Sequence, residues 1–260
     1  MSDYQLSVCA EMVFLDLPFV DRVKRIDELG FAVDIWTFWD KDLEALAATG
    51  ARFSSMQGYI HGDLWSPEGA KEVVRTAKEA IEASKILGAE RLNVHSGELD
   101  DGNAVNFQDT STPATPQMVQ SVKDGLSQLG ELGAAAGVTF TLENLNHKVD
   151  HPGVPLNRAE DTLAIVSELG HPNVKMMLDL YHAQVDEGNL VELVRRADGW
   201  IGEVQVADVP GRHEPGTGEV YYPAIARALR EIGYTGMVGL EGWASGDSAA
   251  ALEAFRTAFA

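Results

Sequence analysis

The chain has 260 residues, of which 40 are acidic and 20 are basic, so its formal net charge is −20. This length suits one large α/β domain or two small ones, and the 45% hydrophobic fraction is enough for a substantial core. So acidic a chain would repel a phosphate backbone, which argues against nucleic acid as a partner.

The sequence also bears on the compartment. It contains one cysteine, Cys9, which excludes a disulfide framework and fits a reducing environment. We interpret Cys9 as a buried inert thiol rather than a nucleophile. No apolar stretch approaches the ~20 residues of a membrane helix. No basic region followed by an apolar run opens the chain, so no signal peptide is expected. The expectation is therefore a cytoplasmic protein without a membrane partner, and the sequence leaves open whether it forms a homo-oligomer.

Short β-branched or apolar runs alternate with amphipathic stretches from one end of the chain to the other. Capping residues mark several of the amphipathic stretches: Ser66 precedes Pro67 at one helix start, and Gly88 follows the same helix. We expect strands at 5–10, 31–36, 52–56, 91–95, 138–143, 174–178, 200–206 and 237–241. We expect helices at 18–29, 40–49, 67–87, 116–136, 158–169, 189–197 and 222–232, and a last helix after the eighth strand.

Eight strand–helix pairs without a linker predict a parallel sheet closed into a (β/α)8 TIM barrel, a single domain over residues 1–260. An open doubly wound sheet is the alternative, but no GxGxxG turn follows the first strand. Barrel sites lie at the carboxyl ends of the strands. The longest polar loops follow strands four, five and seven, at 97–115, 144–156 and 207–219, and so belong to that end.

Four oxygen-bearing side chains fall at the ends of the fifth to eighth strands. Two of them, Glu143 and Glu241, end apolar runs, and a barrel enzyme could use such a pair to move protons or hold a metal. An all-oxygen set suits Mg²⁺ or Mn²⁺. Carboxylates packed together without a cation would raise one another's pKa. The sequence therefore predicts a divalent metal site, unless each residue is an ordinary polar strand end. The predicted ligands are Glu143, Asp179, Gln205 and Glu241.

Two further residues are candidates for substrate binding. His182 lies three residues after Asp179 and could donate to a substrate oxygen, although a solvated ring at a helix start explains it equally well. Arg212 lies on the loop after the seventh strand and could hold a carboxylate or hydroxyl through a forked pair of hydrogen bonds. A surface arginine that balances local acidic charge is the alternative. His95 is interpreted as a core or rim histidine. Four tryptophans could shield the site from water: Trp36, Trp39, Trp65 and Trp243.

The segments 142–156, 178–184, 203–222 and 233–243 resemble the hydroxypyruvate isomerase family, and QVADVPGRHEPGTGE is the most specific match. That family is one of the xylose-isomerase-like barrels, as are ketose 3-epimerases and 2-oxo-tetronate isomerases. The resemblance implies a TIM barrel that interconverts hydroxypyruvate and 2-hydroxy-3-oxopropanoate (tartronate semialdehyde). It also implies that Glu143 and Glu241 are the paired catalytic glutamates, which share a metal with Asp179 and Gln205.

Departures from the family pattern leave the substrate open. The family ordinarily has an aromatic residue and a proline soon after the last glutamate, where this chain reads Glu241-Gly242-Trp243-Ala244. The loop 97–115 is also individual to this chain. A 2-oxo-tetronate isomerase and a ketose 3-epimerase remain alternatives, although ketose epimerases usually have histidine in place of Gln205. A DNA-repair endonuclease is disfavoured by the charge of −20, and a sugar-acid-binding barrel without catalysis is the last alternative.

Overall fold

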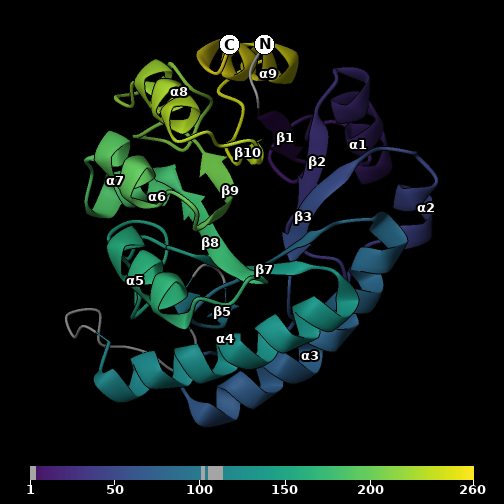
Figure 1. Cartoon of the computed structure of the whole chain (residues 1–260). Coiled ribbons are helices and arrows are strands. Elements are labelled where there is room, and N and C mark those ends of the chain that lie inside the picture. The colour runs from purple at the N-terminus through teal and green to yellow at the C-terminus, as the bar shows by residue number, and fades with distance from the viewer. Residues whose placement is uncertain (1–3, 101–102, 105–113) are drawn as a thin grey trace.

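The computed structural model describes residues 4–100, 103–104 and 114–260. Eight parallel strands close into a barrel in the order β1-β10-β9-β8-β7-β4-β3-β2, and helices surround it (Figure 1). The predicted single-domain TIM barrel is confirmed. The barrel strands are β1 (Gln5–Cys9), β2 (Ala32–Ile35), β3 (Phe53–Gln57), β4 (Arg91–Val94), β7 (Thr139–Glu143), β8 (Val174–Asp179), β9 (Ile201–Val206) and β10 (Met237–Leu240).

The helices follow the capping signals of the sequence. Ser66 and Thr115 each accept a hydrogen bond from the first turn of a long helix, and Gly88 and Gly137 end these helices at φ values of 74° and 76°. None of the described helices combines the length and apolarity needed to cross a bilayer. The helices are α1 (Phe19–Glu28), α2 (Leu43–Ala47), α3 (Pro67–Leu87), α4 (Pro116–Ala136), α5 (Ala159–Leu169), α6 (Leu180–Asp186), α7 (Leu190–Arg196), α8 (Tyr222–Glu231) and α9 (Ser248–Ala258).

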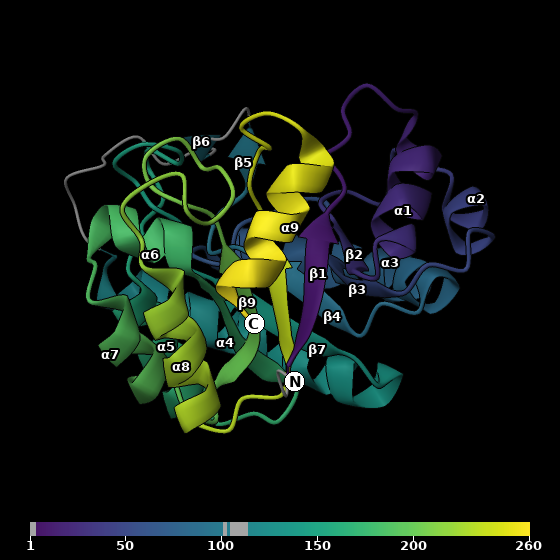
Figure 2. The same ribbon diagram turned by 90° about the horizontal axis from the view of Figure 1, so that it is seen from above.

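Two elements depart from the sequence prediction. Helix α6 was expected only in the alternative that places His182 at a helix start, and it begins directly after β8 because the Asp179 side chain accepts a hydrogen bond from the His182 backbone N–H at 2.8 Å. A short antiparallel hairpin, β5 (Leu99–Asp100) with β6 (Asn103–Ala104), lies within the predicted loop 97–115. The rest of that loop after residue 100, up to residue 113, lies outside the described residues. Figure 2 shows the hairpin at the end toward which β1 points, which is the expected functional end.

The ends of the described chain meet at α9. The Tyr4 hydroxyl donates to the Phe259 carbonyl at 3.0 Å, and the two rings pack edge to face at 6.0 Å. Parallel strands covered by helices are buried on both faces, and accordingly all four residues of β2 and all four of β10 are buried. The main core is therefore one continuous cluster that joins the barrel interior to the helix layer.

A polar cluster interrupts this core inside the barrel. The Ser55 hydroxyl oxygen on β3 lies within hydrogen-bond distance of both acids, 2.9 Å from Glu203 Oε1 and 3.2 Å from Asp34 Oδ1, and Ser7 donates to Asp34 at 2.5 Å. Burial, opposed by these serine hydrogen bonds, raises the pKa of Asp34 to about 6. Burial and then the negative charge of Asp34 raise the pKa of Glu203 well above its ordinary value, although Arg91 lies 3.7 Å away. The carboxyl pair is thus held most easily when protonated.

This cluster predicts a stability that falls as the pH rises. The pKa of Asp34 is higher in the folded state than its unfolded value of 3.8, so the folded protein binds the proton more tightly. The contribution of this proton to the free energy of unfolding is therefore lost as the pH rises from 3.8 to about 6. Asp34→Asn removes this penalty. We therefore expect the Tm of Asp34→Asn minus the Tm of the wild type to increase by about 5 °C when the pH is raised from about 4.5 to about 7. The matched control is Asp27→Asn on the exposed side of α1. A Tm difference that stays constant with pH would contradict the assignment.

Candidate active site

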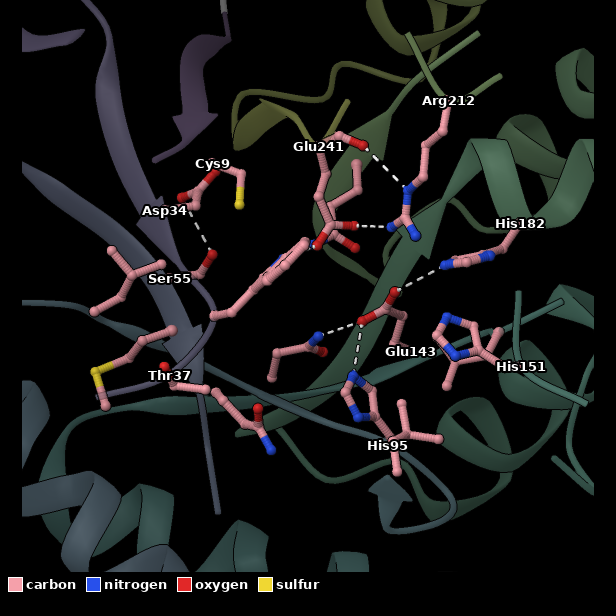
Figure 3. Close-up of a pocket in the computed structure, with 18 residues that line it drawn as sticks. Cys9, Asp34, Thr37, Ser55, His95, Glu143, His151, His182, Arg212 and Glu241 are labelled. Carbon is pink, nitrogen blue, oxygen red and sulfur yellow. Dashed lines mark hydrogen bonds and ion pairs between the residues drawn. The ribbon is translucent and has the colours of Figure 1, made fainter. Parts of the chain in front are cut away.

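The predicted ligand residues all lie at the carboxyl end of the barrel. Glu143 ends β7, Asp179 ends β8, Gln205 lies near the end of β9, and Glu241 follows β10. Asp179 and Gln205 are direct neighbours in the register, and the Glu241 N–H donates to the Val206 carbonyl at 3.0 Å. Glu143, Gln205 and Glu241 line a cavity of about 580 Å³ (Figure 3), and Asp179 is buried at 1% exposure beside it.

Glu143 is held as a carboxylate by donors from β4. Its Oε2 accepts from Asn93 Nδ2 and is 3.2 Å from His95 Nε2. Burial alone would raise the pKa of Glu143, but the hydrogen bond and charge of His95, together with Asn93 and Arg212, hold the pKa below its ordinary value. An ionised carboxylate at this position can act as a base or as a metal ligand.

Arg212 lies between the other two acids. Its Nη2 is 2.6 Å from Glu241 Oε2 and 3.9 Å from Asp179 Oδ2, and its guanidinium lies over the Tyr181 ring at 5.0 Å. The Trp36 indole N–H donates to Glu241 Oε1 at 2.5 Å.

Burial raises the pKa of Glu241, and repulsion from Glu143 adds to this increase. The same two causes raise the pKa of Asp179 well above its ordinary value. The positive charge of Arg212 opposes both increases. One guanidinium therefore faces three buried carboxyl groups.

The donor set fits a divalent cation. Glu143, Asp179 and His182 each offer an atom, and these atoms lie within 4.8 Å of one another. The buried Oε1 of Gln205 has no hydrogen-bond partner among the described residues, which is costly for an amide oxygen unless it has a ligand. Carboxylate and amide oxygens are the ligands that Mg²⁺ and Mn²⁺ take in proteins. Glu241 faces the same cavity, where it is paired with Arg212.

The predicted substrate-binding residues also face this cavity. His182 is 1% exposed, so its ring is not solvated as the alternative required. Burial, and then the charge of Arg212, lowers the pKa of His182 well below its ordinary value. Arg212 is 15% exposed and bonded to Glu241, so it is not a surface arginine. The roles of both residues in substrate binding remain predictions.

Several residues of the site were missed in the sequence. Asn93 and His95 contact Glu143, yet they were not assigned to the site. Their signal was the alternation along β4, where Leu92 and Val94 are buried, while Asn93 between them and His95 directly after them face the cavity. Asp34 and Ser55 form part of the opposite cavity wall (Figure 3).

The four tryptophans have different surroundings. Trp36 and Trp243 pack edge to face at 6.1 Å beside Glu241, where they can limit the access of water. Trp39 is 45% exposed and contacts Phe38. Trp65 packs with Leu145 and Val154 in a small cluster apart from the main core.

A parallel barrel with convergent acids at the carboxyl ends of its strands has the architecture of a barrel enzyme. Residues 18–258 match the xylose isomerase-like TIM barrel family, and the chain belongs to that family.

The named relatives are isomerases. The chain is 28% identical to the 2-oxo-tetronate isomerase of Pectobacterium atrosepticum, over 88% of each chain. It is also 28% identical to the hydroxypyruvate isomerase of Escherichia coli, over 91% of this chain and 92% of that one. The resemblance and the prediction of an isomerase are confirmed. A structure described as AP endonuclease, family 2, from Brucella melitensis superposes with a TM-score of 0.85 at 24% identity, over 98% of each chain, and shows the fold alone.

The unpartnered amide oxygen predicts a contribution of Gln205 to metal affinity. Gln205→Leu keeps most of the side-chain volume but removes the oxygen, so we expect the Kd for Mn²⁺ to rise by at least ~10-fold in calorimetric titrations of the metal alone. Gln184→Leu is the matched control, since Gln184 lies on α6 and donates to the exposed Glu219. Equal Mn²⁺ affinities of the wild type and the Gln205 variant would remove Gln205 from the ligand set.

Proposed function

We propose that this chain interconverts hydroxypyruvate and 2-hydroxy-3-oxopropanoate with the help of a divalent cation, Mg²⁺ or Mn²⁺. The observation that supports the proposal is that two buried glutamates, Glu143 from β7 and Glu241 after β10, face one cavity that also contains an arginine and a histidine. Such a cavity can accept a proton at one side of a small substrate and return it at the other.

The reaction moves one proton between neighbouring carbons and a second proton between their oxygens. Hydroxypyruvate and its aldehyde isomer share one enediolate, which forms when a proton leaves C3 and the carbonyl oxygen at C2 takes up negative charge. One glutamate accepts the proton from C3, and a glutamate returns a proton to C2. The proton of the C3 hydroxyl passes to the C2 oxygen, so that the C3 oxygen becomes the aldehyde and the C2 oxygen becomes a hydroxyl. A cation held by Glu143, Asp179, Gln205 and Glu241 would supply positive charge to the substrate oxygens.

The remaining residues position the substrate. Arg212 is the one arginine or lysine among the described residues that line the cavity, and it can hold the substrate's carboxylate. His182 can donate to a hydroxyl or carbonyl oxygen. The indoles of Trp36 and Trp243 cover the Glu241 side, where exclusion of water strengthens each electrostatic contact.

A 2-oxo-tetronate isomerase is the second candidate, and the cavity itself favours it. A volume of about 580 Å³ leaves room beyond a three-carbon acid, and the polar groups of Asp34, Thr37 and Ser55 line it in addition to the glutamates. These groups could bind the extra hydroxyl of a four-carbon acid. A ketose 3-epimerase would use the same proton transfer on a longer chain.

Catalysis by the glutamate pair can be tested in D₂O. The wild type with Mg²⁺ should convert hydroxypyruvate and place deuterium on the product carbon, measured by proton NMR. Glu143→Gln and Glu241→Gln should each lower kcat by at least ~100-fold, because neither amide can accept a proton. Glu253→Gln, on the exposed face of α9, is the matched control. Turnover of a four-carbon 2-oxo acid in preference to hydroxypyruvate would favour the 2-oxo-tetronate isomerase. If the protein converted no small hydroxy-oxo acid, both candidate functions would be wrong.

If Arg212 binds the carboxylate of the substrate, its substitution should weaken substrate binding. Arg212→Met should raise the KM for hydroxypyruvate by at least ~10-fold, since a hydrogen bond to a charged group contributes about 1.5–3 kcal/mol. Arg212→Lys should restore part of this loss. The control is Arg196→Met, because Arg196 pairs with Glu160 outside the cavity. An unchanged KM in Arg212→Met would show that the carboxylate binds elsewhere.

A further inference from the structure

The two ring nitrogens of His182 have different environments. Nδ1 lies 2.6 Å from the Asn146 amide nitrogen. Nε2 points toward Glu143 Oε1, 3.7 Å away (Figure 3). It is also 3.7 Å from Asp179 Oδ2, and it has no hydrogen-bond partner among the described residues. A neutral imidazole has one donor nitrogen and one acceptor nitrogen. The group that Asn146 presents therefore decides which nitrogen carries the proton.

Neighbouring groups fix the orientation of the Asn146 amide. Its Oδ1 accepts from the backbone N–H groups of Val149 and Asp150, both at 3.0 Å. Its Nδ2 donates to Asp150 Oδ2 at 2.6 Å. A flipped amide would place its NH₂ group against two N–H donors and its oxygen against a carboxylate, so three contacts would become repulsive. The amide nitrogen must therefore face His182 Nδ1.

The segment that follows β7 holds Asn146 rigidly. Asn146 is fully buried, and its carbonyl accepts from the His151 N–H at 3.0 Å. The Tyr181 hydroxyl on α6 donates to Asp150 Oδ2 at 2.9 Å. This bond holds in place the carboxylate that accepts the hydrogen bond of the Asn146 amide. The chain of contacts thus runs from Tyr181 through Asp150 and Asn146 back to His182, the residue after Tyr181.

We propose that Asn146 is a positioning residue that keeps His182 as the Nε2–H tautomer, so that the ring faces the carboxylates as a hydrogen-bond donor and is not a metal ligand. A nitrogen that carries a proton has no lone pair for a cation. Although His182 lies within range of Glu143 and Asp179, the metal is left with the oxygen ligands, and the Nε2–H is free to donate to a substrate oxygen. The identity of that oxygen rests on the proposed function; the tautomer does not.

The tautomer can be read by long-range proton–nitrogen NMR of the metal-free protein with ¹⁵N-labelled histidine. The spectrum of His182→Gln assigns the ring signals. In the wild type we expect a protonated Nε2 and an unprotonated Nδ1. In Asn146→Asp an acceptor replaces the donor that faces Nδ1, so the proton should move to Nδ1. Asn157→Asp makes the same change later in the same loop and should leave the wild-type pattern.

Two further measurements complete the test. If Asn146→Asp does not fold, as judged by circular dichroism, the ¹⁵N shifts of His182 in Asn146→Ala should move from the wild-type values toward the average of the two tautomers, because no donor then keeps Nδ1 unprotonated. Adding Mg²⁺ to the wild type should leave the Nε2 proton in place while other histidine signals from the cavity shift.

The outcomes separate this proposal from the proposed function. A proton on Nδ1 in the wild type, an unchanged pattern in both Asn146 variants, or loss of the Nε2 proton on addition of Mg²⁺ would each overturn it. If no signal responds to Mg²⁺, the metal requirement of the proposed function fails, whereas the metal-free spectra still decide the tautomer.

Discussion

Repulsion among buried carboxylates dominates the carboxyl end of this barrel. Glu143, Asp179 and Glu241 leave parallel strands at the same end, and each is at most 7% exposed. Removing such charges from water costs several kcal/mol per ion unless partners offset it. Arg212 lies 2.6 Å from Glu241 and 3.9 Å from Asp179, but one guanidinium cannot balance three carboxylates. The site therefore has to keep protons on its acids or take up a further cation, and the unpartnered oxygen of Gln205 favours the cation.

The second acidic pair shows the other solution to the same problem. Asp34 and Glu203 lie in the barrel interior, where their hydrogen bonds come mainly from serine hydroxyls and the nearest cation is Arg91 at 3.7 Å. Their pKa values rise, so this pair stores a proton. Glu143, with His95 and Asn93 as donors, has a lowered pKa. The partners of each acid, rather than its burial alone, therefore decide whether its pKa lies below or above the ordinary value.

The sequence was informative where local signals suffice. Helix caps, glycine stops and apolar runs predicted the barrel, and because a strand end is a local feature, they also located Glu143 and Asp179 at the catalytic end. Helix α6 entered the prediction only as an alternative for His182, because Asp179 was interpreted only as a ligand, although it also caps that helix. The predicted barrel already made β4 and β7 neighbours, but Asn93 was not singled out and His95 was interpreted as a core or rim histidine. The side-chain contacts between two strands depend on their register and on side-chain orientation, which have no local signature.

The assignment of His182 shows why proximity alone is a weak guide to a metal site. Its ring nitrogen lies as close to Glu143 as to Asp179, which by distance makes a triad. The hydrogen-bond partner on the opposite side of the ring, Asn146, decides whether that nitrogen offers a lone pair or a proton. The Asn146 amide is in turn oriented by backbone N–H groups of the loop that follows β7. A loop outside the set of charged residues thus controls whether the barrel presents a histidine to a cation or to a substrate oxygen.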